Sequence, residues 1–283
     1  MLMKEHFNII KSLGSGAVSD AYLIDGSRVL LVGKSDRSYM QYKQLCRMLK
    51  IFKGKTFSVK ISCNLKLVKK CKQYPYGALV QDCLPGESLQ QKLPTLSEIQ
   101  KQELGSDLAV FAQEVHNTKC KFSKTKLIKI NLHKYTKSLV LLKTYLPQNI
   151  YEKLCLIKLE YKNFLQASSC CLTHGDLNPG NILLDNNNKL CAILDFGNME
   201  YYVKEVDFAA AYSFDKYVFS AMLQAYSEPL QKDDILLILL AQRVRHFKNI
   251  VGSSQQRVQR HVSDIIALAN KYTLRQNSKR QFS

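Results

Sequence analysis

The sequence has no tryptophan, no pair of cysteines spaced as C-x-x-C and no long apolar run. Its longest uninterrupted apolar stretch, Ile235–Ala241, is far shorter than the roughly 20 residues that a membrane-spanning helix needs. The first residues, Met1–His6, contain no apolar segment followed by a small-residue cleavage site, so they indicate no secretory signal. These absences predict a cytoplasmic protein without a transmembrane segment.

The pattern of cysteines does not indicate a disulfide framework. The nine cysteines are odd in number, scattered along the chain, and several lie within apolar runs. This pattern is typical of reduced, mostly buried thiols in a cytosolic protein, and it argues against a zinc site.

Acidic residues are scarce: 23 carboxylates face 41 lysines and arginines, which gives a net charge of +18. Residues 115–151 contain no carboxylate, and residues 244–283 contain only Asp264. Such an excess of positive charge favours anionic partners, namely a nucleotide, a nucleic acid or an acidic lipid surface. A charged surface without a dedicated polyanion partner is the alternative, since no aromatic interleaving accompanies the lysines.

The periodicity changes about one third of the way along the chain. Strand patterns and a single helix occupy the first part, and helical spacing dominates afterwards. We expect an α+β protein of two lobes, with a strand-rich N-lobe at residues 1–84 and a larger helical C-lobe at residues 85–283, whose polar tail begins after Thr273. A ligand would bind between the lobes. The expected elements are strands at Phe7–Leu13, Ala21–Ile24, Val29–Val32, Val59–Ser62 and Gly77–Val80, a helix within Tyr39–Phe52, and a helix over Leu96–His116 capped by Thr95.

The strongest chemical signal is the segment THGDLNPGNILLD at residues 173–185, followed by AILDFG at residues 192–197. Two apolar stretches around the turn at residues 186–188 predict a β-hairpin. Asp176, Asn181 and Asp195 then converge at one end of this hairpin. This set suits phosphoryl transfer: one carboxylate accepts the proton of an acceptor hydroxyl, while a carboxylate and an amide oxygen bind magnesium ions against the phosphates.

The combination H-G-D-x-x-x-x-N and I-x-D-F-G resembles the catalytic and metal-binding segments of the aminoglycoside and choline phosphotransferases, distant relatives of protein kinases. The resemblance implies a protein-kinase-like fold with an antiparallel sheet in its N-lobe. It implies that Asp176 is the catalytic base and that Asn181 and Asp195 are magnesium ligands. His174 would pack beneath the loop, and Asp207 would anchor the loop by accepting backbone hydrogen bonds.

The segment LGSGAVSDAY at residues 13–22 indicates a loop whose backbone can approach phosphate groups. Its position between two strands matches the family's loop over the nucleotide phosphates, which makes Gly14, Ser15, Gly16 and Ser19 candidate nucleotide-binding residues. Lys34 best matches the family's phosphate-pairing lysine, with Gly33 as a bulge before it.

The family's glutamate partner for that lysine is absent, because Gln41 or Tyr42 stands where it is expected. We therefore expect a hydrogen bond, or a carboxylate from elsewhere such as Asp195, to hold Lys34.

The segment GALVQDCLPGESL at residues 77–89 resembles the family's interlobe linker. Backbone groups near Asp82 and Cys83 would bind a purine edge. Residues 104–116 match a helix of the family that we interpret as scaffold, in which His116 caps or packs.

The expected activity is a small-molecule kinase that uses magnesium and ATP or GTP. Gly175 and Asn178 replace the arginine and lysine typical of protein kinases, and no A-P-E motif follows. The acceptor is a hydroxylated small molecule, whether an aminoglycoside, a neutral sugar or ring, or an anionic compound. The alternative is a nucleotide-binding pseudokinase or a regulatory protein that docks on a polyanion.

Overall fold

The computed structural model describes residues 7–16, 18–119 and 123–274. The expectations that concern Met1–His6, Ala17, Cys120 and the tail beyond residue 274 lie outside these residues. Within the described residues, no helix is long and apolar enough to cross a membrane.

The N-terminal part is built on a five-stranded antiparallel sheet in the order β1-β2-β3-β6-β5. The turn between β2 and β3 uses Asp25 and Gly26, whose φ angles of 50° and 70° are those of a tight hairpin turn. A short strand that the sequence patterns did not indicate, β5, closes the edge beside β6. The strands are β1 (Ile9–Ser15), β2 (Ser19–Ile24), β3 (Arg28–Gly33), β5 (Lys66–Val68) and β6 (Ala78–Asp82).

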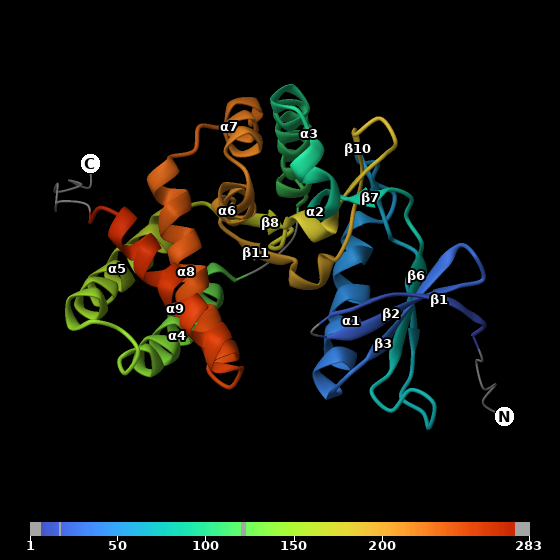
Figure 1. Ribbon diagram of the computed structural model, residues 1–283, viewed down its shortest axis with the longest axis horizontal. Helices are drawn as coiled ribbons and strands as arrows, with labels where there is room; N and C mark the ends of the chain where they lie inside the picture. The colour runs from blue at the N-terminus through green and yellow to red at the C-terminus, as the bar shows by residue number, and fades with distance from the viewer. Residues whose placement is uncertain (1–6, 17, 120–122, 275–283) are drawn as a thin grey trace.

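Helix α1 (Asp36–Met48) follows β3 and continues as the 3-10 helix η1 (Leu49–Phe52). A capping box formed by Ser35 and Ser38 opens α1, which satisfies backbone donors at its first turn. The helix packs against η4 (Phe196–Asn198), the segment that follows Asp195. Helix α1 therefore joins the N-terminal sheet to the predicted catalytic segment (Figure 1).

The predicted hairpin at residues 182–194 is confirmed as β9 (Ile182–Leu184) and β10 (Leu190–Ile193). One expectation is wrong here: the strand expected at Val59–Ser62 does not join the N-terminal sheet. It is β4 (Lys60–Ile61), which pairs in parallel with β10, in a sheet of order β4-β10-β9-β7 completed by β7 (Glu87–Ser88). A third sheet pairs β8 (Cys171–Thr173) with β11 (Glu200–Tyr202).

The rest of the chain is mostly helical, with α2 packed on β9 and α3 packed on β8 and β10. Helix α3 begins after Ser97, not Thr95, because the Ser97 hydroxyl accepts the Gln100 N–H in a capping box. The remaining elements are α2 (Leu89–Lys92), η2 (Leu93–Thr95), α3 (Glu98–His116), α4 (Lys124–Leu142), α5 (Gln148–Ala167), η3 (Pro179–Asn181), α6 (Glu205–Phe214), α7 (Lys216–Ala225), α8 (Lys232–Ile250) and α9 (Gln255–Lys271).

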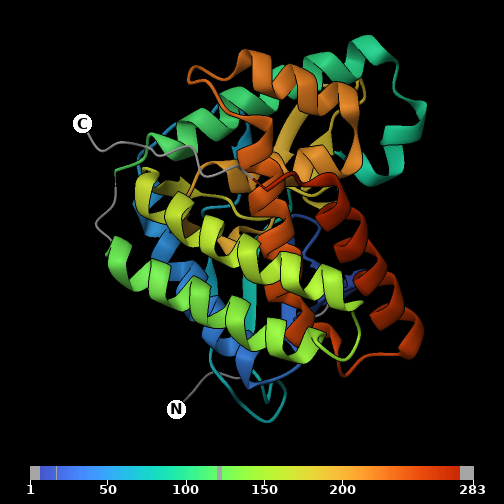
Figure 2. The same cartoon turned by 90° about the vertical axis from the view of Figure 1, so that its left-hand side faces the viewer.

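Helix α8 forms the centre of the helical part. Its apolar run Ile235–Ala241 is buried on every side, since α4, α5, α6 and α9 all pack against this helix. Figure 2 looks onto this group, with α4 and α5 lying side by side in front. The predicted strand-rich N-terminal part and larger helical C-terminal part are confirmed; the boundary between residues 84 and 85 stays a prediction.

The expectation that the cysteines are mostly buried is wrong. The eight cysteines in the described residues are free, and none of them is fully buried; Cys63, Cys71 and Cys155 are exposed.

Candidate active site

The segment that connects β8 to η3 carries the predicted catalytic aspartate. Gly175, just before Asp176, has a φ of +78°, and an added Cβ would lie 2.5 Å from the backbone oxygen of Asn198. Only glycine tolerates both the left-handed backbone and this close approach. The glycine therefore lets η4 lie directly against the Asp176 loop.

The Asp176 carboxylate is held by two amides. Asn178 Nδ2 donates to Oδ1 at 2.7 Å, and Asn198 Nδ2 donates to Oδ2 at 3.0 Å. Both carboxylate oxygens thus have a fixed orientation, and among the described residues no cationic side chain forms an ion pair with them. Such a carboxylate stays available to accept a proton.

The two predicted metal ligands lie beside this loop. Asn181 Nδ2 donates to the backbone oxygen of Asp176 at 2.9 Å, which leaves Asn181 Oδ1 as a ligand atom. The Leu194 N–H donates to the Asn181 backbone oxygen at 2.8 Å, so the residue before Asp195 is tied to the same loop.

Asp195 itself has left-handed backbone angles (φ 57°, ψ 70°), a conformation that costs energy for a non-glycine residue and that recurs at active sites. Its Oδ1 accepts the Gly197 N–H at 3.0 Å, and the side chain is exposed. One carboxylate and one amide oxygen form a hard oxygen set of the kind Mg²⁺ uses when phosphates and waters complete its shell. No group of three or more His, Cys, Asp or Glu side chains suited to a metal occurs within the described ranges.

Asp207, at the start of α6, is completely buried and ties the loop to the helical core. Its Oδ1 accepts the Gly175 N–H at 2.7 Å, and its Oδ2 accepts the His174 N–H at 2.9 Å. His116 Nε2 lies 3.0 Å from the same Oδ2, and His116 Nδ1 lies 2.7 Å from the Tyr226 hydroxyl. Burial alone would raise the pKa of Asp207, but the hydrogen bond and charge of His116 outweigh it and lower the pKa.

His174 is buried beneath the loop, with its ring 4.6 Å from the ring of Phe196. Its Nε2 lies 3.0 Å from the Leu194 carbonyl oxygen, which can only accept, and its Nδ1 faces the Asp176 N–H at 3.2 Å, which can only donate. These partners require a neutral ring protonated on Nε2. Burial lowers the pKa of His174, in agreement with that form.

The predicted phosphate loop and Lys34 lie together at one edge of the N-terminal sheet. Gly14 and Ser15 end β1, and Gly16 follows. Lys34 Nζ donates to Ser15 Oγ at 2.6 Å and to the Gly16 backbone oxygen at 2.7 Å. Asp20 Oδ1 accepts from the same ammonium at 3.0 Å. Hydrogen bonds from Ser15 and then Lys34 lower the pKa of Asp20.

The partner of Lys34 is therefore Asp20 and not Asp195. The bulge expected at Gly33 is also absent, because the register of β2 with β3 is continuous up to the Ser19–Gly33 pair. Glycine is required at position 33 for a different reason, because an added Cβ would lie 2.7 Å from the Tyr76 backbone oxygen.

Gln41 and Tyr42 are the two residues of α1 at the expected position of the missing glutamate, and Tyr42 forms a hydrogen bond with Ser19. Its hydroxyl lies 2.6 Å from Ser19 Oγ, so the Ser19 side chain is turned toward α1. Burial raises the pKa of Tyr42, and the charges of Asp20 and Asp195 raise it further.

At the linker, the backbone donors of the two predicted purine-binding residues already have partners. The Asp82 N–H donates to Ser62 Oγ at 3.2 Å, and the Cys83 N–H donates to the Ser27 oxygen at 2.9 Å. Asn64 Nδ2 donates to the Asp82 carboxylate at 2.8 Å. A purine edge would accordingly meet the carbonyl oxygens here.

Sequence reasoning missed three residues of this network: Asp20, Asn198 and His116 as an Asp207 partner. Asp20 sits beside the glycine-rich loop, and its place opposite Ser15 in the β1–β2 hairpin could have indicated it. No comparable signal exists for Asn198 or His116, since their partners come from distant segments.

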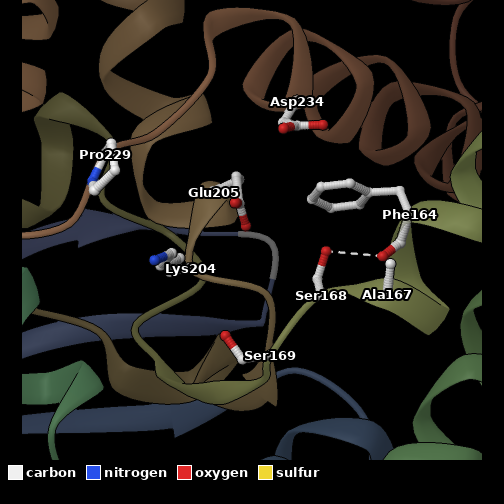
Figure 3. A pocket seen from close by; sticks show the side chains of 8 residues that line it. All are labelled: Phe164, Ala167, Ser168, Ser169, Lys204, Glu205, Pro229 and Asp234. Carbon is white, nitrogen blue, oxygen red and sulfur yellow. Dashed lines mark hydrogen bonds between the residues drawn. The ribbon is translucent and has the colours of Figure 1, made fainter. Parts of the chain in front are cut away.

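A cavity of about 260 Å³ lies away from this site, where the end of α5 meets the start of α6 (Figure 3). Glu205 and Asp234 face it, and burial raises the pKa of Glu205. None of the predicted site residues lines this cavity. Its lining residues are Phe164, Ala167, Ser168, Ser169, Lys204, Glu205, Pro229 and Asp234.

The sequence profile of the phosphotransferase enzyme family matches residues 9–233. None of the curated protein sequences is similar enough to match the chain.

Solved structures with the same fold cover nearly all of the chain. A ternary complex of streptomycin, ATP and APH(2″)-IIa is 20% identical, with 95% of this chain and 94% of that one covered and a TM-score of 0.72. The GDP complex of aminoglycoside 2′-phosphotransferase-IIIa is 17% identical, with 95% and 93% covered and a TM-score of 0.74. The macrolide 2′-phosphotransferase MphH from Brachybacterium faecium is 14% identical, with 95% and 96% covered and a TM-score of 0.63. The predicted two-lobed kinase-like fold is thereby confirmed.

Proposed function

This chain belongs to the phosphotransferase enzyme family, and we propose that it transfers the γ-phosphoryl group of ATP or GTP to a hydroxyl group of a small molecule. The observation that carries the proposal is the position of Asp176. Its carboxylate is oriented by Asn178 and Asn198, and its backbone oxygen binds Asn181, a predicted metal ligand. The proposed base and a predicted metal ligand are thus tied together by a hydrogen bond within one loop.

In the proposed reaction Asp176 orients the acceptor hydroxyl and accepts its proton. The acceptor oxygen forms a bond to the γ-phosphorus while the bond between this phosphorus and the leaving nucleoside diphosphate breaks. Because such transition states are loose, the base mainly positions the nucleophile, and positioning supplies much of the rate gain. The amides of Asn178 and Asn198 keep the carboxylate in one orientation for this task.

Asn181 and Asp195 would hold the magnesium ions. When bound, magnesium bridges phosphate oxygens and neutralises the charge that develops on them. The Asn181 side chain donates to the Asp176 backbone oxygen, and the Leu194 N–H donates to the Asn181 backbone oxygen. These two hydrogen bonds would hold Asn181 and Asp195 close to Asp176.

The nucleotide phosphates would lie beneath residues 14–16, within reach of Lys34. This lysine is already drawn to the loop by Ser15 and Gly16, so phosphate oxygens would replace neutral partners of the ammonium. The neighbouring structures include complexes with ATP and with GDP, and we propose that a purine triphosphate of either base is the donor.

Two features favoured the pseudokinase alternative: the missing acidic partner of Lys34 and the basic surface of the chain. Asp20 supplies that partner at 3.0 Å from a different element, which favours a working nucleotide site.

The test is hydrolysis of ATP and GTP with magnesium, followed by a screen of hydroxylated compounds for the mass increase of one phosphate. We expect turnover in the native protein and its loss in the Asp176→Asn and Asp195→Asn variants, with nucleotide binding retained in Asp176→Asn. Nucleotide binding without any turnover in the native protein would overturn the enzyme proposal.

A further inference from the structure

Helix α1 contacts two segments that the proposed function uses. It packs against β3, β5 and β6 of the N-terminal sheet and against η4, which follows the predicted metal ligand Asp195 (Figure 1). Ser38 in its first turn and Tyr42 in the next lie on one face of the helix, because residues four apart are neighbours there. Both side chains are buried. Their hydroxyl groups reach the end of the loop that precedes β2.

The Ser38 hydroxyl joins three backbone groups. It donates to the Val18 backbone oxygen at 2.7 Å. It accepts the Lys34 N–H at 3.1 Å and the Ser35 N–H at 3.2 Å. A hydroxyl has one donor and two acceptor sites, so every site of this side chain is in use. Ser38 therefore fastens the end of the loop to α1 and to the residue that follows β3.

Tyr42 forms a second link, to the next residue of the chain. Its hydroxyl lies 2.6 Å from the Oγ of Ser19, the first residue of β2. The tyrosine is only 3% exposed, and a hydrogen bond shielded from water is stronger than an exposed one. Helix α1 thus holds two consecutive residues, Val18 by its backbone and Ser19 by its side chain.

The two links differ from the contacts that Lys34 makes with the same loop. Lys34 binds Ser15 Oγ and the Gly16 backbone oxygen, and in the proposed function phosphate oxygens draw its ammonium away from them. The hydroxyls of Ser38 and Tyr42 are buried, so phosphates would not replace their contacts. A loop that is already held when its ligand arrives loses less conformational entropy on binding.

The same helix relates the loop to the metal-binding segment. Phe52, in η1 at the end of α1, lies edge-on to Phe196, with ring centroids 5.8 Å apart. Phe196 directly follows Asp195 and is buried. The loop and Asp195 would both act on the nucleotide phosphates, so their spacing affects how well the phosphates are held. A single helix packed against both segments sets that spacing.

We propose that Ser38 and Tyr42 are positioning residues for the nucleotide phosphates, because they fix the loop before β2 to the helix that packs against the Asp195 segment. The inference rests on the proposed function, since it concerns how the same nucleotide site is held. Helix α1 would then act on the loop directly through two hydroxyls, and a carboxylate on α1 that pairs with Lys34 is not needed for this task.

The first experiment compares Tyr42→Phe with the matched control Tyr135→Phe. Tyr135 is also buried, and its hydroxyl donates to the Leu154 backbone oxygen at 3.0 Å between α4 and α5. Calorimetry with magnesium measures the binding of ADP and GDP and, by competition, of adenosine and guanosine. We expect Tyr42→Phe to bind the diphosphates about three- to tenfold more weakly, the effect of one buried hydrogen bond, and the nucleosides like the native protein.

The control Tyr135→Phe should bind both kinds of ligand with native affinity, although thermal unfolding should show a similar loss of stability in the two variants. Ser38→Ala should weaken diphosphate binding in the same selective way as Tyr42→Phe. A tyrosine that only supports the fold would not separate diphosphates from nucleosides. Native affinity for the diphosphates in Tyr42→Phe, or equal weakening of diphosphate and nucleoside, would overturn the inference.

The second experiment tests whether Tyr42 acts through Ser19. The Ser19→Ala variant removes the partner of the tyrosine hydroxyl, so the double variant should bind ADP no more weakly than either single variant. Additive losses would mean that the two side chains act independently and would also overturn the inference. In nucleotide hydrolysis the KM of Tyr42→Phe should rise by the same factor as its dissociation constant, with a smaller change in kcat. Failure of the proposed function shows separately, as absent hydrolysis in the native protein.

Discussion

Replacing Asp207 with asparagine tests whether this buried carboxylate anchors the catalytic loop. The native side chain accepts hydrogen bonds from two backbone N–H groups, those of His174 and Gly175, and lies 3.0 Å from His116 Nε2. An asparagine offers one acceptor oxygen and one donor NH₂ in the same volume. Either orientation of the amide leaves one backbone N–H facing a donor.

An unpaired buried N–H costs about 1–3 kcal/mol, and the remaining contacts lose their charge assistance. We expect a total destabilisation of about 3–5 kcal/mol, the range for breaking a buried charged pair. For a chain of this size that corresponds to a fall of about 5–15 °C in Tm. Thermal and urea unfolding followed by circular dichroism measure the change, and kcat should fall more than the KM for nucleotide rises.

The matched control is Glu103→Gln, which removes an exposed partner of Lys189 and should leave the unfolding midpoint unchanged. The pH dependence provides an independent check. Because the pKa of Asp207 is lowered, its stabilisation is present above the unfolded pKa of about 3.9 and is lost as the pH falls through the folded value. An Asp207→Asn protein with native Tm and native kcat would refute the reasoning.

The remaining predictions concern the site itself. Asn198→Ala frees one oxygen of Asp176, so kcat should fall about tenfold while the KM for nucleotide stays constant in steady-state assays; an unchanged kcat would contradict the positioning role. Asp20→Asn removes the charge that orients Lys34, so nucleotide KM should rise several-fold with a smaller change in kcat; tighter nucleotide binding would show instead that Asp20 competes with the phosphates. His174 has a lowered pKa, so its stabilisation is present above the unfolded pKa of about 6.5 and is lost as the pH falls through the folded value. Unfolding midpoints measured between pH 4.5 and 8 should show this slope in the native protein and a flatter one in His174→Gln.

The fold was predictable where local pattern and long-range pairing agree. The hairpin β9–β10 has two apolar stretches around a polar turn, which predicts its pairing, although the register shifts between Leu190 and Ala192. The residues at 59–62 have the same strand pattern, but their partner is β10, more than a hundred residues away. Propensity identifies a strand, whereas sheet membership depends on the tertiary pairing, and so β4 was assigned to the wrong sheet.

Within the site, motif residues were predictable because their roles require fixed residue types at fixed spacing. The residues that support them were not predictable, because short polar side chains from several different elements can form the same hydrogen bond. Lys34 illustrates this: the sequence showed that α1 offers no carboxylate, but only the β1–β2 register places Asp20 at the ammonium. The cysteines illustrate the reverse error, because apolar neighbours in sequence do not imply burial in a chain whose surface also carries apolar residues.

The sequence shows an excess of basic residues but does not show which of them come together in the structure. Lysines spread along residues 115–151 suggest only a general attraction for anions. In the structure α4 packs on α8, and the charges of Arg245 and Lys134 act on the buried Glu200 of β11, so part of the positive charge faces a carboxylate within the helical part.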